Sequence, residues 1–237
     1  MRSLRRLAIA LVILGGLFVG ANIYAERLAE ERLGDAVAVA FGLSEAPEVD
    51  LSVFPIATRI FTGTLPEVTF TADDITVEDL TVASLTVELR DVEVVGGLLG
   101  SGKLAVEVGE GNVTAIVSED GVNELLATRD QRATVRLLAD GRVRARAVRT
   151  FLGARRTIVS VGRLELRRRT LTYTADEVTV DGEEPPSVLE QEARRRATLA
   201  VMIPELPGGF RAQELQVEED QVTLLASVSG SRINLVS

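Results

Sequence analysis

The first residues of the chain combine a basic start with a long uncharged run. Three arginines lie within residues 1–6, and no further charged residue occurs until Glu26. As a helix, the run 7–25 would be about 28 Å long, close to the roughly 30 Å hydrocarbon core of a bilayer. The small residues near its end equally fit a signal-peptide cleavage site. Residues 1–25 are therefore predicted to be a cleaved signal peptide or a retained N-terminal membrane anchor, and the basic start places the rest outside the cytoplasm.

Residues 26–41 repeat apolar side chains at helical spacing. Leu28, Leu33 and Val37 fall near one face together with Ala40 and Phe41, while charged residues occupy the opposite face. That charged face mixes acidic and basic residues, whereas helices that lie on a membrane surface typically have a basic one. The pattern therefore predicts an amphipathic helix packed on the protein's own domain.

After Gly63 the pattern changes to period two, which indicates β-strands. Val68, Phe70 and Ala72 alternate with threonines, and residues 85–89 alternate in the same way. Valine and threonine dominate, as expected of a pleated surface with one solvated side. This part of the chain is predicted to be mainly antiparallel β-sheet.

Helical segments follow the strands at two places. One begins near Asp120, which can serve as its N-cap, and the other begins with a capping box at 187–190, directly after two prolines. Runs of strands that each end in a helix predict a β-rich α+β fold, with a mostly antiparallel sheet packed on helices.

A twelve-residue pattern occurs twice in the β-rich part. Residues 68–79 and 171–182 are identical at six of the twelve positions, and most other pairs are conservative. Each copy is interpreted as a strand, a turn and a strand, so convergence on a generic hairpin is one explanation. The matched order favours the other, an internal repeat at about 64–128 and 164–203 within a single domain over 26–237.

Arginine is concentrated in one stretch of an otherwise acidic chain. Between Arg129 and Arg169 there are thirteen arginines and three acidic residues, a local balance of +10. The whole chain has 26 basic and 35 acidic residues and a net charge of −9, so the remainder carries −19. Such a local excess of one sign marks the stretch as a candidate binding surface.

The register of this stretch follows from its turn. A three-residue loop at 139–141, whose final glycine takes the left-handed conformation, is a common hairpin connection. It pairs Leu137 with Val143 and Val135 with Ala145 on one face. A two-residue loop would set the apolar side chains opposite arginines, which burial disfavours.

This register gathers arginines on the other face of the sheet. Two further arginines at period two on the next strand extend this face. The full set is Arg136, Arg142, Arg144, Arg146, Arg163 and Arg167. Like charges opposite one another destabilise a sheet, so the face invites an anion, and the planar guanidinium suits phosphate. The six are candidate lipid-headgroup ligands, because phospholipid is the nearest abundant phosphate for a membrane-tethered protein. A solvated face balanced by acids such as Glu190 and Glu192 explains the same pattern.

The composition narrows the possible chemistry. The 237 residues include no His, no Cys and no Trp. A Ser-His-Asp triad, a thiolate nucleophile and the usual zinc ligands are therefore excluded. Aromatic residues make up only 4%, and together with the acidic net charge this argues against nucleic acid as partner. We expect no enzyme, no cofactor and no metal site, with a carboxylate-dependent hydrolase as a weaker alternative.

Several segments resemble a known family. The segment VFPIATRIFTG at 53–63, which precedes the Val/Thr strands, and the segment IPELPGGF at 203–210 are the most specific, and AER at 25–27 fits as well. Over residues 24–236 the chain is similar to the actinobacterial LmeA-type phospholipid-binding family. The resemblance implies an exported or membrane-bound protein with a tubular, lipid-holding, β-rich fold. It also implies phosphatidylinositol-type lipid as partner and a link to the elongation of mannose-bearing envelope glycolipids.

With such a fold, we expect an elongated molecule of two similar halves. Its strongly curved sheet is expected to enclose an apolar groove against the helices. The candidate groove residues, which equally fit ordinary core positions, are Phe54, Phe61, Leu65, Val68 and Phe70. The predicted function is non-catalytic binding or transfer of anionic phospholipid at the outer face of the cytoplasmic membrane. The alternative is a structural module that scaffolds an envelope glycosyltransferase and holds no lipid.

Overall fold

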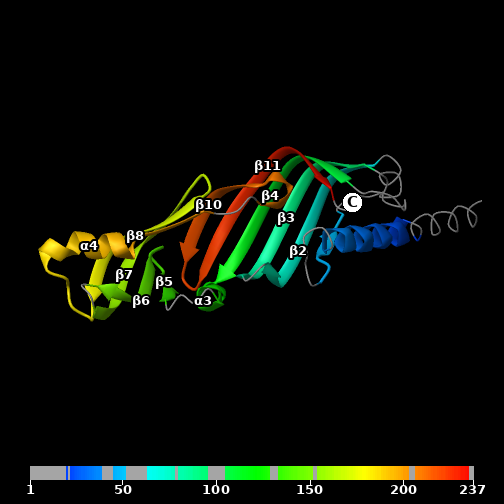
Figure 1. The fold of residues 1–237 in the computed structure, drawn as a ribbon. Helices are drawn as coiled ribbons and strands as arrows, with labels where there is room; N and C mark the ends of the chain where they lie inside the picture. The colour runs from blue at the N-terminus through cyan, green and yellow to red at the C-terminus, as the bar shows by residue number, and fades with distance from the viewer. Residues whose placement is uncertain are drawn as a thin grey trace, which may run out of the picture. The chain divides into compact units, whose positions relative to one another are not determined.

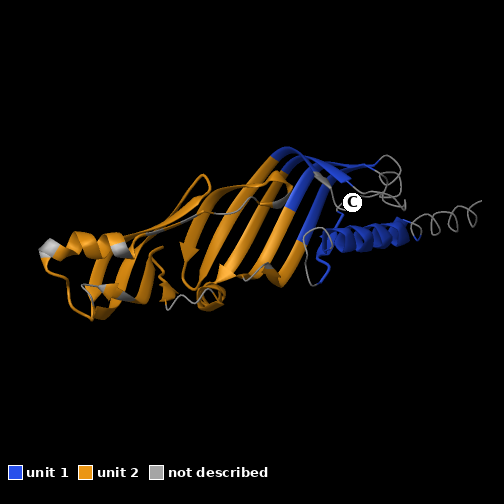
Figure 2. Cartoon of the chain, in the orientation of Figure 1, with its two compact units in different colours: residues 1–70, 88–110, 229–237 blue, residues 71–87, 111–228 orange. Residues whose placement is uncertain are grey.

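The chain folds into a β-rich α+β structure that divides into two compact units (Figure 2). The computed structural model describes residues 20, 22–38, 45–51, 63–77, 80–95, 105–128, 133–151, 154–202 and 206–234. Unit 1 comprises residues 1–70, 88–110 and 229–237, and unit 2 comprises residues 71–87 and 111–228.

The larger sheet has six strands in the order β1-β2-β3-β4-β11-β10 (Figure 1). Their bounds are β1 Glu48–Asp50, β2 Thr64–Val77, β3 Leu80–Val95, β4 Ala105–Ser118, β10 Arg211–Glu218 and β11 Gln221–Asn234. The long strands β2, β3 and β4 are neighbours both along the chain and in the sheet, and β10 and β11 form an antiparallel hairpin. The expected antiparallel, β-rich architecture is confirmed.

The smaller sheet lies entirely within unit 2 and has five strands in sequence order, β5 to β9. Their bounds are β5 Ala133–Leu137, β6 Val143–Phe151, β7 Ala154–Arg167, β8 Thr170–Val180 and β9 Leu199–Met202. Each neighbouring pair is antiparallel. Helix α3 (Glu119–Thr128) precedes β5, helix α4 (Ser187–Ala197) stands between β8 and β9, and a 3-10 turn η1 (Pro207–Gly209) precedes β10.

Neither sheet curls strongly in the part of the chain that the structure describes, so the expected strong curvature is wrong (Figure 1). Pronounced curvature requires repeated bulges or glycine kinks that bend neighbouring strands together. In the smaller sheet, β5–β6 and β6–β7 pair without a register shift, and β7–β8 shifts once. The alternating Val/Thr pattern predicted strands correctly, but alternation alone does not bend a sheet.

The amphipathic helix predicted at 26–41 is confirmed, with an earlier start. The structure describes it over 22–38, and residues 39–41 lie outside the described residues. Ala29, Leu33 and Ala36 form its buried stripe, and Leu33 is only 2% exposed. The helix therefore packs on its own unit. Within the described residues, no helix has the length and apolar character needed to cross a bilayer. Of the predicted N-terminal segment 1–25, only residues 20 and 22–25 are described.

The core of unit 2 lies on one face of the smaller sheet. It joins Leu137, Val143 and Ile158 of the sheet with Ala193 of α4 and Val222 of β11. Leu215 and Val217 of β10, only half-buried, pack against this cluster. One face of β5–β8 is therefore covered by α4 and by the β10–β11 hairpin, and this arrangement leaves the opposite face to solvent.

Helix α3 fixes the edge of the smaller sheet through polar side chains. Asn123 Oδ1 accepts the Val135 N–H at 2.8 Å, and Asn123 Nδ2 donates to the Val135 carbonyl at 3.0 Å, as a neighbouring strand would. The N-cap is Ser118, whose Oγ accepts the Gly121 N–H at 3.1 Å, instead of the expected Asp120. The expected capping box of α4 is likewise absent, because Ser187 is already the first helical residue and Pro186 is the N-cap.

The repeated twelve-residue pattern forms strands in both places but not a strand, a turn and a strand. Residues 69–77 lie within β2, and residues 172–180 lie within β8. In β2, Asp74 takes a left-handed φ of 51° while the strand continues. Two more strands separate β2 from α3, whereas β8 leads directly to α4. The expected turn is therefore wrong, and the internal repeat stays a prediction.

Candidate functional site

The hairpin at the centre of the arginine-rich stretch has the predicted geometry. The Leu138 N–H donates to the Arg142 carbonyl at 2.9 Å, which closes a three-residue loop, and Gly141 takes a φ of +78°. The register pairs Leu137 with Val143 and Val135 with Ala145. Leu137 and Val143 therefore face the core, as the burial pattern predicted.

All six candidate arginines lie on the smaller sheet or its hairpin loop, away from the core cluster. Arg136 pairs directly with Arg144 across β5 and β6, and Thr134 pairs with Arg146. Arg136, Arg144, Arg146, Arg163 and Arg167 are exposed, and Arg142 is half-buried. The predicted basic face is thus a feature of the fold, although its members do not all have the same surroundings.

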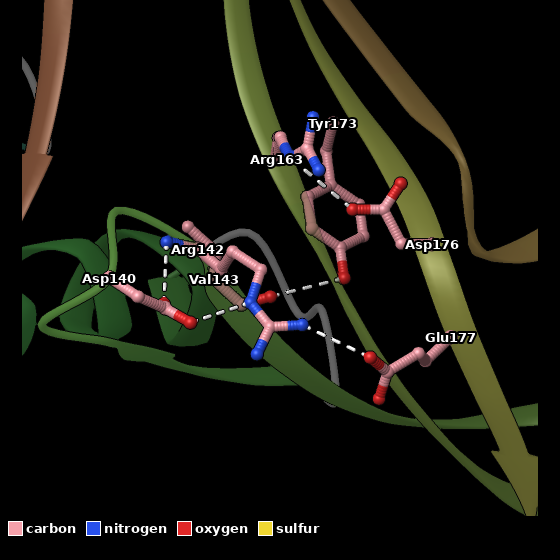
Figure 3. A network of polar contacts seen from close by, with 7 residues as sticks. All are labelled: Asp140, Arg142, Val143, Arg163, Tyr173, Asp176 and Glu177. Atoms are coloured by element: carbon pink, nitrogen blue, oxygen red, sulfur yellow. Dashed lines mark hydrogen bonds and ion pairs between the residues drawn. The ribbon is translucent and has the colours of Figure 1, made fainter.

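Arg142 is held by two carboxylates (Figure 3). Its Nε lies 2.7 Å from Asp140 Oδ2, and its Nη1 lies 3.0 Å from Glu177 Oε1. The hydrogen bond with Asp140, and then that with Glu177, raise the pKa of the Arg142 guanidinium above its usual value. The same side-chain hydrogen bond lowers the pKa of the Asp140 carboxyl. Arg142 is therefore largely committed to intramolecular partners.

Arg163 and Arg167 also have acidic neighbours. Arg163 Nε lies 3.5 Å from Asp176 Oδ2, and Arg167 Nη2 lies 2.9 Å from Glu165 Oε2. The acids named as a possible counterbalance, Glu190 and Glu192, instead pair with Arg194 and Arg195 along α4. The six candidate arginines are balanced in part, by acids of the same sheet and its hairpin loop.

A bulge explains why two consecutive acids reach this face. Val161 pairs with Glu177 and Gly162 pairs with Ala175, so Asp176 is an extra residue in β8. An extra residue lets neighbours in sequence point to one side of the sheet. The register predicted from the sequence did not include these acidic partners. The signal for them was Gly162 within a strand, because an isolated glycine in a strand often marks a bulge or a close backbone approach.

Three arginines differ from the others in their surroundings. Among the described residues, no carboxylate forms an ion pair with Arg136, Arg144 or Arg146. All three are exposed on β5 and β6, and two of them face each other directly. These three side chains are the part of the predicted headgroup site that is available to an external anion.

On the opposite face, the buried hydroxyl of Tyr173 connects three strands, and Figure 3 shows its contact with the Val143 carbonyl oxygen. The Tyr173 hydroxyl donates to Ser160 Oγ at 2.9 Å and lies 3.3 Å from the Val143 carbonyl oxygen. Burial raises the pKa of Tyr173, so the ring stays neutral at physiological pH. This network fixes β6, β7 and β8 relative to one another and holds the arginine-bearing face in place.

The candidate groove residues are buried where the structure describes them. Leu65 and Val68 are each 1% exposed and Phe70 is 9% exposed. Phe54 and Phe61 lie outside the described residues. Burial of this kind is what an ordinary core position shows, and a lipid-lined groove at these residues stays a prediction.

Unit 1 has a pocket of about 380 Å³ at the ends of β3, β4 and β11. Its lining includes Asp91, Glu93 and Glu107, and Glu107 Oε1 lies 3.3 Å from Arg232 Nη1. A charged lining does not suit lipid tails, which need aliphatic walls. Across the described ranges, no group of three or more acidic residues could hold a metal ion.

Comparison with known protein families found a match for this chain. A family model described as LmeA-like phospholipid-binding covers residues 20–227 of the 237. No curated protein and no solved structure matches the chain. The family match spans both compact units, including the whole arginine-bearing sheet.

Proposed function

The chain belongs to the LmeA-like phospholipid-binding family, and from this membership we propose that it binds or transfers phospholipid without catalysing a reaction. The observation that carries the proposal is the match to a family described as phospholipid-binding over residues 20–227. The lack of His and Cys agrees with a binding role, because the commonest general base, imidazole, and the thiolate nucleophile are missing.

We further propose that the bound lipid is anionic. The support is the local balance of +10 between Arg129 and Arg169, together with the three exposed arginines that have no described acidic partner. Guanidinium groups form bidentate hydrogen bonds with phosphate, and each basic residue near an anionic membrane surface contributes about 1 kcal/mol.

Lipid extraction from the purified protein tests the binding role. The full chain is purified in mild detergent, extracted with organic solvent and analysed by mass spectrometry. The control is a fusion of residues 1–25 to an unrelated soluble protein, because that apolar segment would itself retain lipid. We expect about one phospholipid per chain in excess of the control, as for a single binding site. Equal lipid in both samples would contradict the proposal and favour a scaffolding module that holds none.

The proposed location is the outer face of the cytoplasmic membrane. Its support is the basic start of the chain followed by the uncharged run 7–25. We expect a reporter enzyme that is active only outside the cytoplasm to work when fused after Ser237. Activity at that position of a reporter that works only in the cytoplasm would refute export. Sequencing the N-terminus of the mature protein distinguishes a cleaved peptide from a retained anchor.

A further inference from the structure

A patch of basic and apolar side chains covers the exposed face of β5, β6 and β7. Its members are Arg136, Arg144, Arg146, Val148, Val159 and Val161, referred to here as the Arg–Val patch. The register places Arg144 opposite Val161 and Arg146 opposite Val159. Val148 follows two residues after Arg146 on the same strand, so it shares this face, and it is 37% exposed.

Both the arginines and the valines of the Arg–Val patch are in an unfavourable arrangement when the patch faces water. Arg136 and Arg144 are directly opposite each other in the register, and like charges in that position destabilise a sheet. No described carboxylate forms an ion pair with either of them. The valines between the arginines leave apolar surface exposed, which the aliphatic stems of the arginines cover only in part. A partner with both anionic groups and an apolar phase relieves both costs.

The described part of unit 2 leaves this face accessible. The core cluster lies on the other side of the sheet, where Leu137, Val143 and Ile158 contact α4 and the β10–β11 hairpin. The acids of the sheet gather toward β8, where Asp176 and Glu177 engage Arg163 and Arg142. Arg136, Arg144 and Arg146 lie on β5 and β6 instead, the side of the sheet that ends at an edge strand (Figure 1).

On these grounds, and resting on the proposed phospholipid binding, we propose that the Arg–Val patch is a docking surface for the anionic surface of a lipid bilayer. The arginines contact headgroup phosphates, and the valines contact the apolar region beneath them, in the way that interfacial segments combine charge and apolar area. A soluble polyanion would use only the arginines. The interleaved valines, and the lack of aromatic side chains in the patch, favour a bilayer over a nucleic acid.

The experiment places a probe beside the patch in the full chain. Because the sequence has no Cys, Thr134→Cys creates a unique attachment site for an environment-sensitive fluorophore. Thr134 is exposed and pairs with Arg146, so all six patch residues remain. Gln191→Cys on α4 is also exposed and gives the matched control position. Both labelled proteins are reconstituted in vesicles of phosphatidylcholine alone, or of equal parts phosphatidylcholine and phosphatidylglycerol.

We expect a blue-shifted emission from the label at 134 in the anionic vesicles only, and no shift from the label at 191. The triple variant Arg136→Gln, Arg144→Gln, Arg146→Gln should lower the ratio of docked to undocked patch by about a hundredfold, since each basic residue near the surface contributes roughly a fivefold factor. The variant Arg194→Gln, Arg195→Gln, Arg211→Gln loses the same charge elsewhere in unit 2 and should keep the shift. Raising the salt to about 1 M, where screening acts within ~3 Å, should abolish the shift without any substitution.

Equal shifts in both vesicle types, no shift at 134, or an equal response to dextran sulfate without lipid would each overturn the docking surface. If the triple variant fails to fold by circular dichroism, the salt reversal in the parent decides the question alone. A negative result in this fluorescence experiment is distinct from failure of the proposed function, because the extraction experiment measures bound lipid independently of docking. A protein that carries phospholipid but shows no shift keeps the function and loses the docking surface.

Discussion

Gly162→Ala is expected to lower the free energy of unfolding by about 3 kcal/mol, the upper part of the usual range for overpacking a well-ordered site. A Cβ at this position would clash with the Thr174 carbonyl oxygen and would lie 2.8 Å from the Ala175 Cα. Both are backbone atoms of the neighbouring strand, so no side chain can rotate away to make room. Gly162 stands at the register shift between β7 and β8, and relief of the clash has to move the bulge itself.

Urea denaturation followed by circular dichroism measures this effect. Thr174→Ala on the neighbouring strand is the control, because Thr174 is exposed and the smaller side chain brings no atom into a packed site. We expect the control to change the free energy of unfolding by no more than about 0.5 kcal/mol. If the two variants were equally stable, the close approach of β7 and β8 at Gly162 would be refuted.

Leu137→Ala is expected to cost about 3 kcal/mol, within the range for removing a buried leucine side chain from a core. Leu137 is 2% exposed and belongs to the core cluster of unit 2. Its neighbour Arg136 points to the opposite face, so Arg136→Ala should change the free energy of unfolding by no more than about 0.5 kcal/mol. The two variants differ by one position in the same strand and form a pair of matched measurements.

This pair tests the register of the hairpin directly. A slip of one residue would exchange the two faces of β5, and the arginine would then become the costly position. Urea denaturation of both variants distinguishes the two registers. A larger loss for Arg136→Ala than for Leu137→Ala would show that the arginines face inward.

The hairpin register was predictable because two independent signals agreed. Gly141 supplies the left-handed residue of a three-residue loop, and that loop places the apolar partners Leu137 and Val143 together. A glycine requirement and a burial pattern are both local, and the sequence shows both. The same reasoning set the arginines on one face, where the structure has them.

The ion pairs on that face could not be predicted in the same way. Asp176 and Glu177 reach the arginines only because β8 has one extra residue at the bulge opposite Gly162. A bulge changes the alternation of a strand at one point, and the alternating pattern of the sequence does not specify where. Within the described part of the chain, six apparently equivalent arginines thereby divide into those with an acidic partner and those without one.

One turn predicted from the sequence, within residues 68–79, is wrong for a related reason. The segment 68–79 was interpreted as a strand, a turn and a strand, but Asp74 adopts its left-handed φ of 51° inside β2. The corresponding reversal after β8 occurs later, at Asp181 and Gly182, which have φ values of 53° and 88°. Aspartate tolerates the left-handed conformation in bulges as well as in turns, so its presence alone does not specify a chain reversal.

The lipid composition of the purified protein tests the central claim most directly. In the organic extract of the full chain, the ratio of anionic to zwitterionic phospholipid is measured by mass spectrometry and compared with that of the membranes from which it came. Arginines that bind phosphate without balancing acids favour headgroups with net negative charge, so we predict an extract clearly enriched in anionic phospholipid. An extract that contains phospholipid in the same proportions as the membrane would contradict the anionic preference, and an extract without phospholipid beyond the control fusion would contradict lipid binding itself.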